Sequence, residues 1–126
     1  MDLKTKIYLI NSENEKFMGI GVVWLLEEIK KHSSLRAAAN EIGISYSKAY
    51  SMMNMLENSL GKIILVRRRG GYSRQGAYLT EFGEEFLKAY KAFHKEIKEI
   101  TKGPYDKFND EIDSLLSKYD KEGNEL

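Results

Sequence analysis

The sequence predicts a mainly α-helical protein with one small β-hairpin, and three observations support this prediction. Apolar side chains recur at helical spacing in residues 19–32, 34–60, 80–102 and 105–119. Two short apolar runs, 63–66 and 77–79, enclose a segment rich in glycine and arginine, which is typical of a hairpin. The 126 residues suffice for one core of ordinary size and an appendage. We therefore expect one helical domain with a hairpin at residues 1–80, followed by a helical extension at residues 81–126.

Composition narrows the class of protein. Apolar residues make up 42% of the chain and charged residues 31%, as in soluble globular proteins. The sequence has no cysteine, no apolar run long enough to span a bilayer and no signal-peptide pattern at its start. We therefore expect a cytoplasmic protein that contacts no membrane and holds no metal or cofactor.

Charge is distributed unevenly along the chain. Residues 1–80 carry 12 Lys and Arg against 7 Asp and Glu, whereas residues 81–126 carry 8 against 12, although the net charge is only +1. A basic first part and an acidic second part predict that any contact with a polyanion is confined to the first part.

The first 33 residues are expected to form a strand and a helix. Residues 4–11 are rich in β-branched and aromatic side chains and predict a short strand, with a turn at 11–15. Residues 19–32 have apolar side chains around most of the helix circumference, so we expect this helix in the middle of the domain with Trp24 in the core.

Residues 34–60 predict two short helices joined by a tight turn. Ser34 and Ser45 are N-cap candidates for the two helices, and Gly43 can adopt the positive φ at which the first helix ends. In the second helix, the apolar positions face inward. The polar and tyrosine side chains face outward, and these are Tyr46, Ser47, Lys48, Tyr50, Ser51 and Asn54. This arrangement is typical of a helix-turn-helix, whose second helix enters the DNA major groove.

The hairpin after this motif predicts a wing. Residues 63–66 and 77–79 form its strands, and Gly70 and Gly71 permit the turn between them. The arginines of this segment can bind phosphates or enter the minor groove. An ordinary hairpin with a solvated basic tip would have the same composition, but its position directly after a helix-turn-helix favours the DNA-binding interpretation.

The longest helix is expected at residues 80–102. Thr80 can cap it, and we expect residues 103–104 to end it. Its apolar stripe has nearly heptad spacing and is too long for the small domain to cover. We therefore predict a homodimer seam made of Phe82, Phe86, Tyr90, Phe93, Ile97 and Ile100. The alternative is that this stripe packs against the last helix, expected at residues 105–119.

With these elements in place, the chain resembles the DNA-binding domain of ModE-type, molybdate-responsive transcription regulators, and more distantly the N-terminal domain of LysR-type regulators. The resemblance covers roughly residues 7–100. It is carried by the segment SLRAAANEIGISYSKAY, by ILV before the wing, by Gly-Gly and Gly-Ala in the wing, and by Leu79–Thr80 with Gly83. The resemblance implies a winged helix-turn-helix that dimerises through the helix after the wing and binds palindromic operators.

The predicted function is therefore a sequence-specific DNA-binding transcription regulator that acts as a homodimer on double-stranded DNA. The residues expected to contact DNA are Ser34, Arg36, Ser45, Tyr46, Ser47, Lys48, Tyr50, Arg67, Arg68, Arg69, Tyr72 and Arg74. Only 24 residues follow Lys102, so we expect no oxyanion-sensor domain in this chain, and the sequence identifies no small-molecule effector.

Two other classes of function fit the sequence less well. An enzyme is not expected, because the chain has only two histidines, no cysteine and no known catalytic motif. A winged-helix protein–protein interaction module is the alternative that remains open, and the basic wing favours DNA over it.

Overall fold

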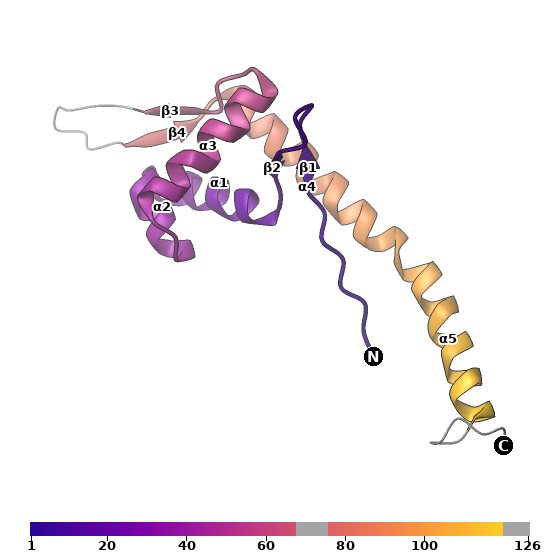
Figure 1. The fold of residues 1–126 in the computed structure, drawn as a ribbon. Helices are drawn as coiled ribbons and strands as arrows, with labels where there is room; N and C mark the ends of the chain where they lie inside the picture. Colours follow the sequence, from indigo (N-terminus) through magenta and orange to yellow (C-terminus); the bar gives the residue numbers. More distant parts are fainter. Residues whose placement is uncertain (68–75, 120–126) are drawn as a thin grey trace. The chain divides into compact units, whose positions relative to one another are not determined.

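The computed structural model describes residues 1–67 and 76–119 (Figure 1). Mainly helical, with two small antiparallel hairpins, it confirms the predicted fold class. The chain divides into two compact units, Lys6–Lys91 and a second unit of Met1–Thr5 with Ala92–Leu126. The boundary expected between residues 80 and 81 falls at the start of the helix α4 (Glu81–Ile100), which runs through both units.

The core of the first unit is built around α1 (Ile20–His32). Its side chains Leu25, Leu26 and Ile29 are fully buried. The helices α2 (Leu35–Ile42) and α3 (Tyr46–Leu60) pack on it, as does the strand β4 (Ala77–Leu79). Small residues let the helices approach closely, since Ala38, Ala39 and Ala49 have almost no exposed surface. The prediction that this apolar stripe lies in the core is confirmed.

The expectation for Trp24 was wrong, because 54% of this side chain is exposed. Trp24 lies two positions from both Val22 and Leu26, which places it on the face of α1 opposite the buried stripe. A single layer of α2, α3 and β4 covers only one face of a 13-residue helix. Ile20, one turn earlier on the same outer face, is also exposed.

A short N-terminal hairpin replaces the single strand expected at residues 4–11. Its strands are β1 (Leu9–Ile10) and β2 (Lys16–Met18), and Met18 is fully buried in the core. Asn11 organises the turn, because its side-chain oxygen accepts hydrogen bonds from the backbone N–H groups of Glu13 and Glu15. The amide group of Asn11 also donates to Ser59 Oγ at 3.0 Å, which ties the hairpin to the end of α3.

The break after the long helix lies earlier than expected. α4 ends at Ile100, and α5 (Lys102–Lys118) begins at once, so Gly103 and Pro104 lie in its first turn rather than between the helices. A proline is tolerated there because the first turn of a helix has no acceptor for its backbone N–H. The proline therefore lies in the first turn of α5, although we expected it to precede this helix.

The second unit is held by contacts from the N-terminal segment. The ammonium group of Lys98 donates to the backbone carbonyl and hydroxyl oxygens of Thr5, and the Tyr105 hydroxyl donates to the Met1 carbonyl at 2.6 Å. No side chain of α5 is buried, so this helix does not bury its apolar residues in the described part of the chain. None of the helices in the described ranges has the length and apolar character needed to cross a membrane.

Candidate nucleic-acid interface

The turn between α2 and α3 has the capping pattern that the sequence predicted. Ser34 Oγ accepts a hydrogen bond from the N–H of Ala37, and Ser45 Oγ accepts one from the N–H of Lys48, each at 3.0 Å. Gly43 ends α2 with a φ of 75°, in the left-handed region that glycine adopts without strain. The helix-turn-helix prediction is confirmed, and both serine hydroxyls are already engaged as caps.

The outer face of α3 carries the side chains that were expected there. Ser47 and Lys48 are exposed, 41% of Tyr50 is exposed, and Tyr46 is partly exposed. The opposite face is buried through Ala49, Met53 and Leu56. The N-terminal half of α3 thus presents a polar and aromatic surface on a helix that the core holds in place.

Two arginines from neighbouring elements lie against the tyrosines of α3. The Arg36 guanidinium, from α2, lies 4.4 Å from the centre of the Tyr46 ring, and the Arg67 guanidinium lies 4.4 Å from the centre of the Tyr50 ring. The two rings are 6.3 Å apart, with their planes inclined by 43°. We call these four residues the arginine–tyrosine row. The sequence predicted its members separately, but not that they stack.

Stacking changes what these arginines can do. A guanidinium over an aromatic face gains about 0.5–1 kcal/mol at an exposed site and still has its N–H groups free to donate in its own plane. Within the described residues, neither Arg36, Arg67 nor Lys48 forms an ion pair with a carboxylate. The row is therefore an ordered, positively charged strip along one side of the exposed α3 surface.

The base of the wing is fixed to this surface. The strands β3 (Leu65–Arg67) and β4 pair antiparallel, with Leu65 opposite Leu79 and Arg67 opposite Ala77. Two N–H groups at the start of β3, those of Ile64 and Leu65, donate to one carboxylate oxygen of Glu57 at 2.8 and 2.9 Å. Glu57 belongs to α3, so the recognition helix and the wing strand are joined directly.

Two further contacts hold the other strand and the helix that follows it. The N–H of Ala77 donates to the Ser33 carbonyl at 2.9 Å, which ties β4 to the turn before α2. Thr80 caps α4 by accepting from the N–H of Gly83, as expected, and its hydroxyl donates to the Ile63 carbonyl. Sequence reasoning missed the roles of Glu57, Asn11 and Ser33, because a lone polar residue in a helix or turn gives no signal of a distant partner.

The tip of the wing lies outside the described residues. Four of the residues expected to contact DNA fall there, and these are Arg68, Arg69, Tyr72 and Arg74. Their contribution stays a prediction from the sequence. Among the residues of the described ranges, no group of three His, Cys, Asp or Glu side chains could hold a metal ion.

The residues of the expected dimer seam differ in exposure. Phe82 and Phe93 are 38% and 42% exposed, Ile100 is 59% exposed, and Phe86 and Ile97 are partly buried. Tyr90 is only 3% exposed, and its hydroxyl donates to the Ile7 carbonyl at 3.1 Å. Tyr90 therefore belongs to the core of its own chain rather than to a seam, because residue 7 of the N-terminal segment supplies the acceptor for its hydroxyl. The other five positions remain a predicted interface.

Comparison with known proteins agrees with this geometry. Residues 23–84 match the family of bacterial regulatory helix-turn-helix proteins of the lysR family. Residues 23–84 are therefore similar to a LysR-type helix-turn-helix domain. They include α2, α3, β3, β4 and the first residues of α4. All four residues of the arginine–tyrosine row lie within this segment.

Curated relatives of this chain are named as regulators or molybdenum proteins. The chain is 34% identical over 83 residues to the molybdenum-pterin-binding protein MopB of Rhodobacter capsulatus, which covers 66% of this chain and 31% of MopB. It is 30% identical over 96 residues to the transcriptional regulator ModE of Yersinia pestis, which covers 74% of this chain and 35% of ModE. The resemblance to ModE-type and LysR-type proteins is confirmed, and the chain spans about a third of the length of these relatives.

A solved structure shares the fold of much of this chain. The protein in the CbnR_DBD–DNA complex superposes with a TM-score of 0.51 at 23% identity, covering 75% of this chain and 99% of that one. This similarity supports the winged helix-turn-helix architecture of the domain.

Proposed function

We propose that this chain is a sequence-specific DNA-binding transcription regulator. The arginine–tyrosine row carries this proposal. It places two guanidinium groups beside the exposed tyrosines at the start of α3, the part of a recognition helix that contacts base edges. The ModE relative is a transcriptional regulator, and the CbnR_DBD structure is a DNA complex.

The proposed division of roles follows the geometry. Tyr46, Ser47, Lys48 and Tyr50 enter the major groove, where Lys48 donates to a guanine and a tyrosine ring contacts a thymine methyl group. Arg36 and Arg67 bind phosphates at the edge of the groove. Ser34 and Ser45 contribute through the helix N-termini that they cap, since backbone N–H groups at a helix start also bind phosphate. The wing tip adds further phosphate or minor-groove contacts.

We also propose that the regulator acts as a homodimer on a palindromic site. Phe82 and Ile100 support this, because both are apolar side chains of α4 that are exposed to solvent. A dimer would present two copies of α3 about 34 Å apart, which is one turn of the DNA helix.

A protein–protein interaction module is the second candidate. Exposed tyrosine and arginine side chains are also typical of protein interfaces. Binding of double-stranded DNA by the purified chain separates the two, because the module would show no salt-dependent affinity for DNA.

The experiment compares single variants in fluorescence anisotropy with a DNA duplex at several salt concentrations. We expect Arg36→Gln and Arg67→Gln each to reduce the slope of log affinity against log salt by about one unit, as the loss of one phosphate contact does. Lys88→Gln is the matched control, because Lys88 is an exposed cation on α4 outside the proposed surface. Equal slopes for all four proteins would remove the row from the interface.

A further inference from the structure

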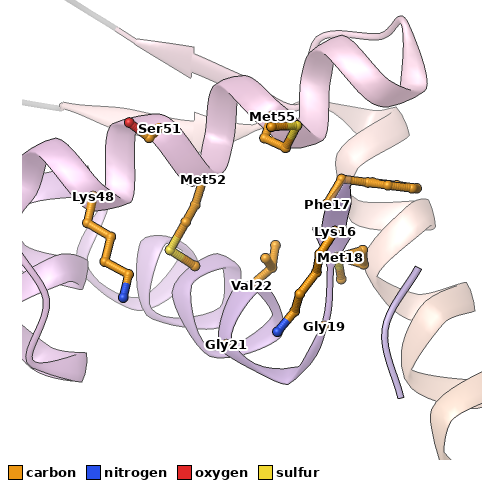
Figure 2. Close-up of a pocket in the computed structure, with 10 residues that line it drawn as sticks. All are labelled: Lys16, Phe17, Met18, Gly19, Gly21, Val22, Lys48, Ser51, Met52 and Met55. Carbon is orange, nitrogen blue, oxygen red and sulfur yellow. The ribbon is translucent and has the colours of Figure 1, made fainter. Parts of the chain in front are cut away.

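A hollow lies beside the recognition helix, on the side away from the arginine–tyrosine row. Its volume is about 400 Å³, within the range of about 300–1,000 Å³ that small-molecule sites occupy. Figure 2 shows that three elements surround it: β2, the first turn of α1, and the middle of α3. Gly21 opens directly onto it, since a Cβ atom added there would meet only the Met52 methyl group, at 4.0 Å.

The walls of the hollow are apolar. Val22 is almost fully buried and forms the floor next to the thioether side chains of Met52 and Met55 (Figure 2). Methionine side chains adapt to ligands of different shape because they are unbranched and polarisable. Such walls favour a ligand with an apolar body over a fully hydrated ion such as free phosphate.

The rim of the hollow is cationic. Figure 2 shows Lys48 of α3 and Lys16 of β2 on its two sides, with Met52 between them. None of the ten residues that line it is acidic, and the first turn of α1 carries no acidic side chain. In the described part of the chain neither lysine forms an ion pair, although the Lys16 ammonium lies 5.0 Å from the centre of the Tyr8 ring. Two lysines with no acidic neighbour in the lining favour an anionic ligand at this rim.

We propose that this hollow binds a small amphipathic carboxylate, with its apolar body against Met52, Met55 and Val22 and its carboxylate between Lys16 and Lys48. Binding would also regulate the domain, a part of the proposal that rests on the proposed function. Lys48 belongs both to the rim of the hollow and to the surface proposed to contact bases. A carboxylate paired with Lys48 neutralises it and holds it away from DNA, so the ligand and DNA compete.

Methionine methyl groups report on this site directly. We would label the methionine ε-methyl groups with ¹³C and titrate the whole chain with octanoate to about 10 mM, since a ligand this small is expected to bind in the millimolar range. We expect the Met52 and Met55 signals to shift and saturate. Met53 is the internal control, because it lies on the buried face of α3 and is fully covered.

Two comparisons test whether octanoate binding depends on the carboxylate charge and on the open space of the hollow. Octanamide, which has the same chain without the charge, should shift the two signals much less. Lys16→Gln should weaken octanoate binding by about two- to fivefold, as expected for one exposed ion pair, and Gly21→Leu should abolish it by filling the hollow. Unmoved Met52 and Met55 signals, equal effects of octanamide, or wild-type binding by both variants would overturn the proposal.

The coupling to DNA is tested separately, by anisotropy with a bound duplex. Octanoate should lower the DNA affinity of the wild type, and it should lower that of Lys16→Gln less. Saturable octanoate shifts without any effect on DNA affinity would overturn the competition with DNA. Because the methyl signals need no DNA, a failure of the chain to bind DNA would refute the proposed function and leave the ligand site standing.

Discussion

Glu57 joins the recognition helix to the wing, and its removal gives a sharp test of how the interface is held. One carboxylate oxygen of Glu57 accepts two backbone hydrogen bonds, at 2.8 and 2.9 Å, from the start of β3. Glu57→Ala leaves both N–H groups without this acceptor in a partly buried place.

The size of the effect follows from these two bonds. A hydrogen bond to a charged group contributes about 1.5–3 kcal/mol when it is buried, and partial access of water reduces this value. We therefore expect Glu57→Ala to lower the free energy of unfolding by about 2–3 kcal/mol. For a unit of this size each kcal/mol shifts Tm by about 4–8 °C, so Tm should fall by about 8–24 °C.

Thermal unfolding followed by circular dichroism measures this change. Glu57→Gln keeps an oxygen that can accept both bonds but lacks the charge, so it should lose about half as much as Glu57→Ala. Glu41→Ala is the matched control, since Glu41 is an exposed glutamate of α2 and should change stability by less than about 0.5 kcal/mol. If Glu57→Ala unfolds within about 2 °C of Glu41→Ala, the assigned role of Glu57 is refuted.

Four further predictions concern packing, pH, base contact and assembly. Gly83→Ala should destabilise the chain by about 1–3 kcal/mol, because its Cβ would lie 2.9 Å from the Ile64 backbone oxygen. Gly21→Ala would meet only the Met52 methyl group, at 4.0 Å, and should stabilise α1 by up to about 1 kcal/mol in urea unfolding. Burial raises the pKa of Tyr90, so the unfolded chain loses this proton first and stability should fall as the pH rises above about 10; Tyr90→Phe should flatten that fall in urea melts at high pH. Lys48→Ala should cost about 1–3 kcal/mol of affinity for a selected site and relax its preference at one base pair; an equal loss on every sequence would instead make Lys48 a phosphate contact. Phe86→Asp should yield monomers in sedimentation, and a persistent dimer would move the interface to another surface.

Local chemistry made much of the fold predictable from the sequence. The caps at Ser34 and Ser45 and the left-handed turn at Gly43 depend on residues a few positions away, so their roles can be read from spacing alone. The buried stripe of α1 and the pairing of the wing strands follow from apolar periodicity in the same way.

The predictions for Trp24, Tyr90 and Pro104 were wrong. For Trp24 and Tyr90, burial depends on contacts with distant parts of the chain. Trp24 was placed in the core because α1 is apolar around most of its circumference, but the neighbouring elements cover only one face. Tyr90 fitted the spacing of the predicted seam, yet residue 7 accepts its hydrogen bond and it is buried within the chain. Gly103–Pro104 predicts a helix stop, but Pro104 lies in the first turn of α5, which accepts proline.

In the candidate site, too, local features could be predicted and contacts between different elements could not. The sequence placed Tyr46 and Tyr50 on the outer face of α3, because side-chain direction follows from helix geometry. It could not show that Arg36 and Arg67 stack on them, since both contacts join different elements. The hollow between Lys16 and Lys48 likewise depends on how β2 packs beside α3.

The central claim is that the surface around the start of α3 reads DNA sequence. The most direct test is to select duplexes from a random pool with the purified chain at about 50 mM salt, and to measure the affinity of the selected sequence as the salt concentration rises. We predict a palindromic consensus with half-sites one helical turn apart, and an affinity that falls steeply with salt and is lost in Tyr50→Ala. No enrichment of any sequence, or the same consensus and affinity in Tyr50→Ala, would contradict the claim.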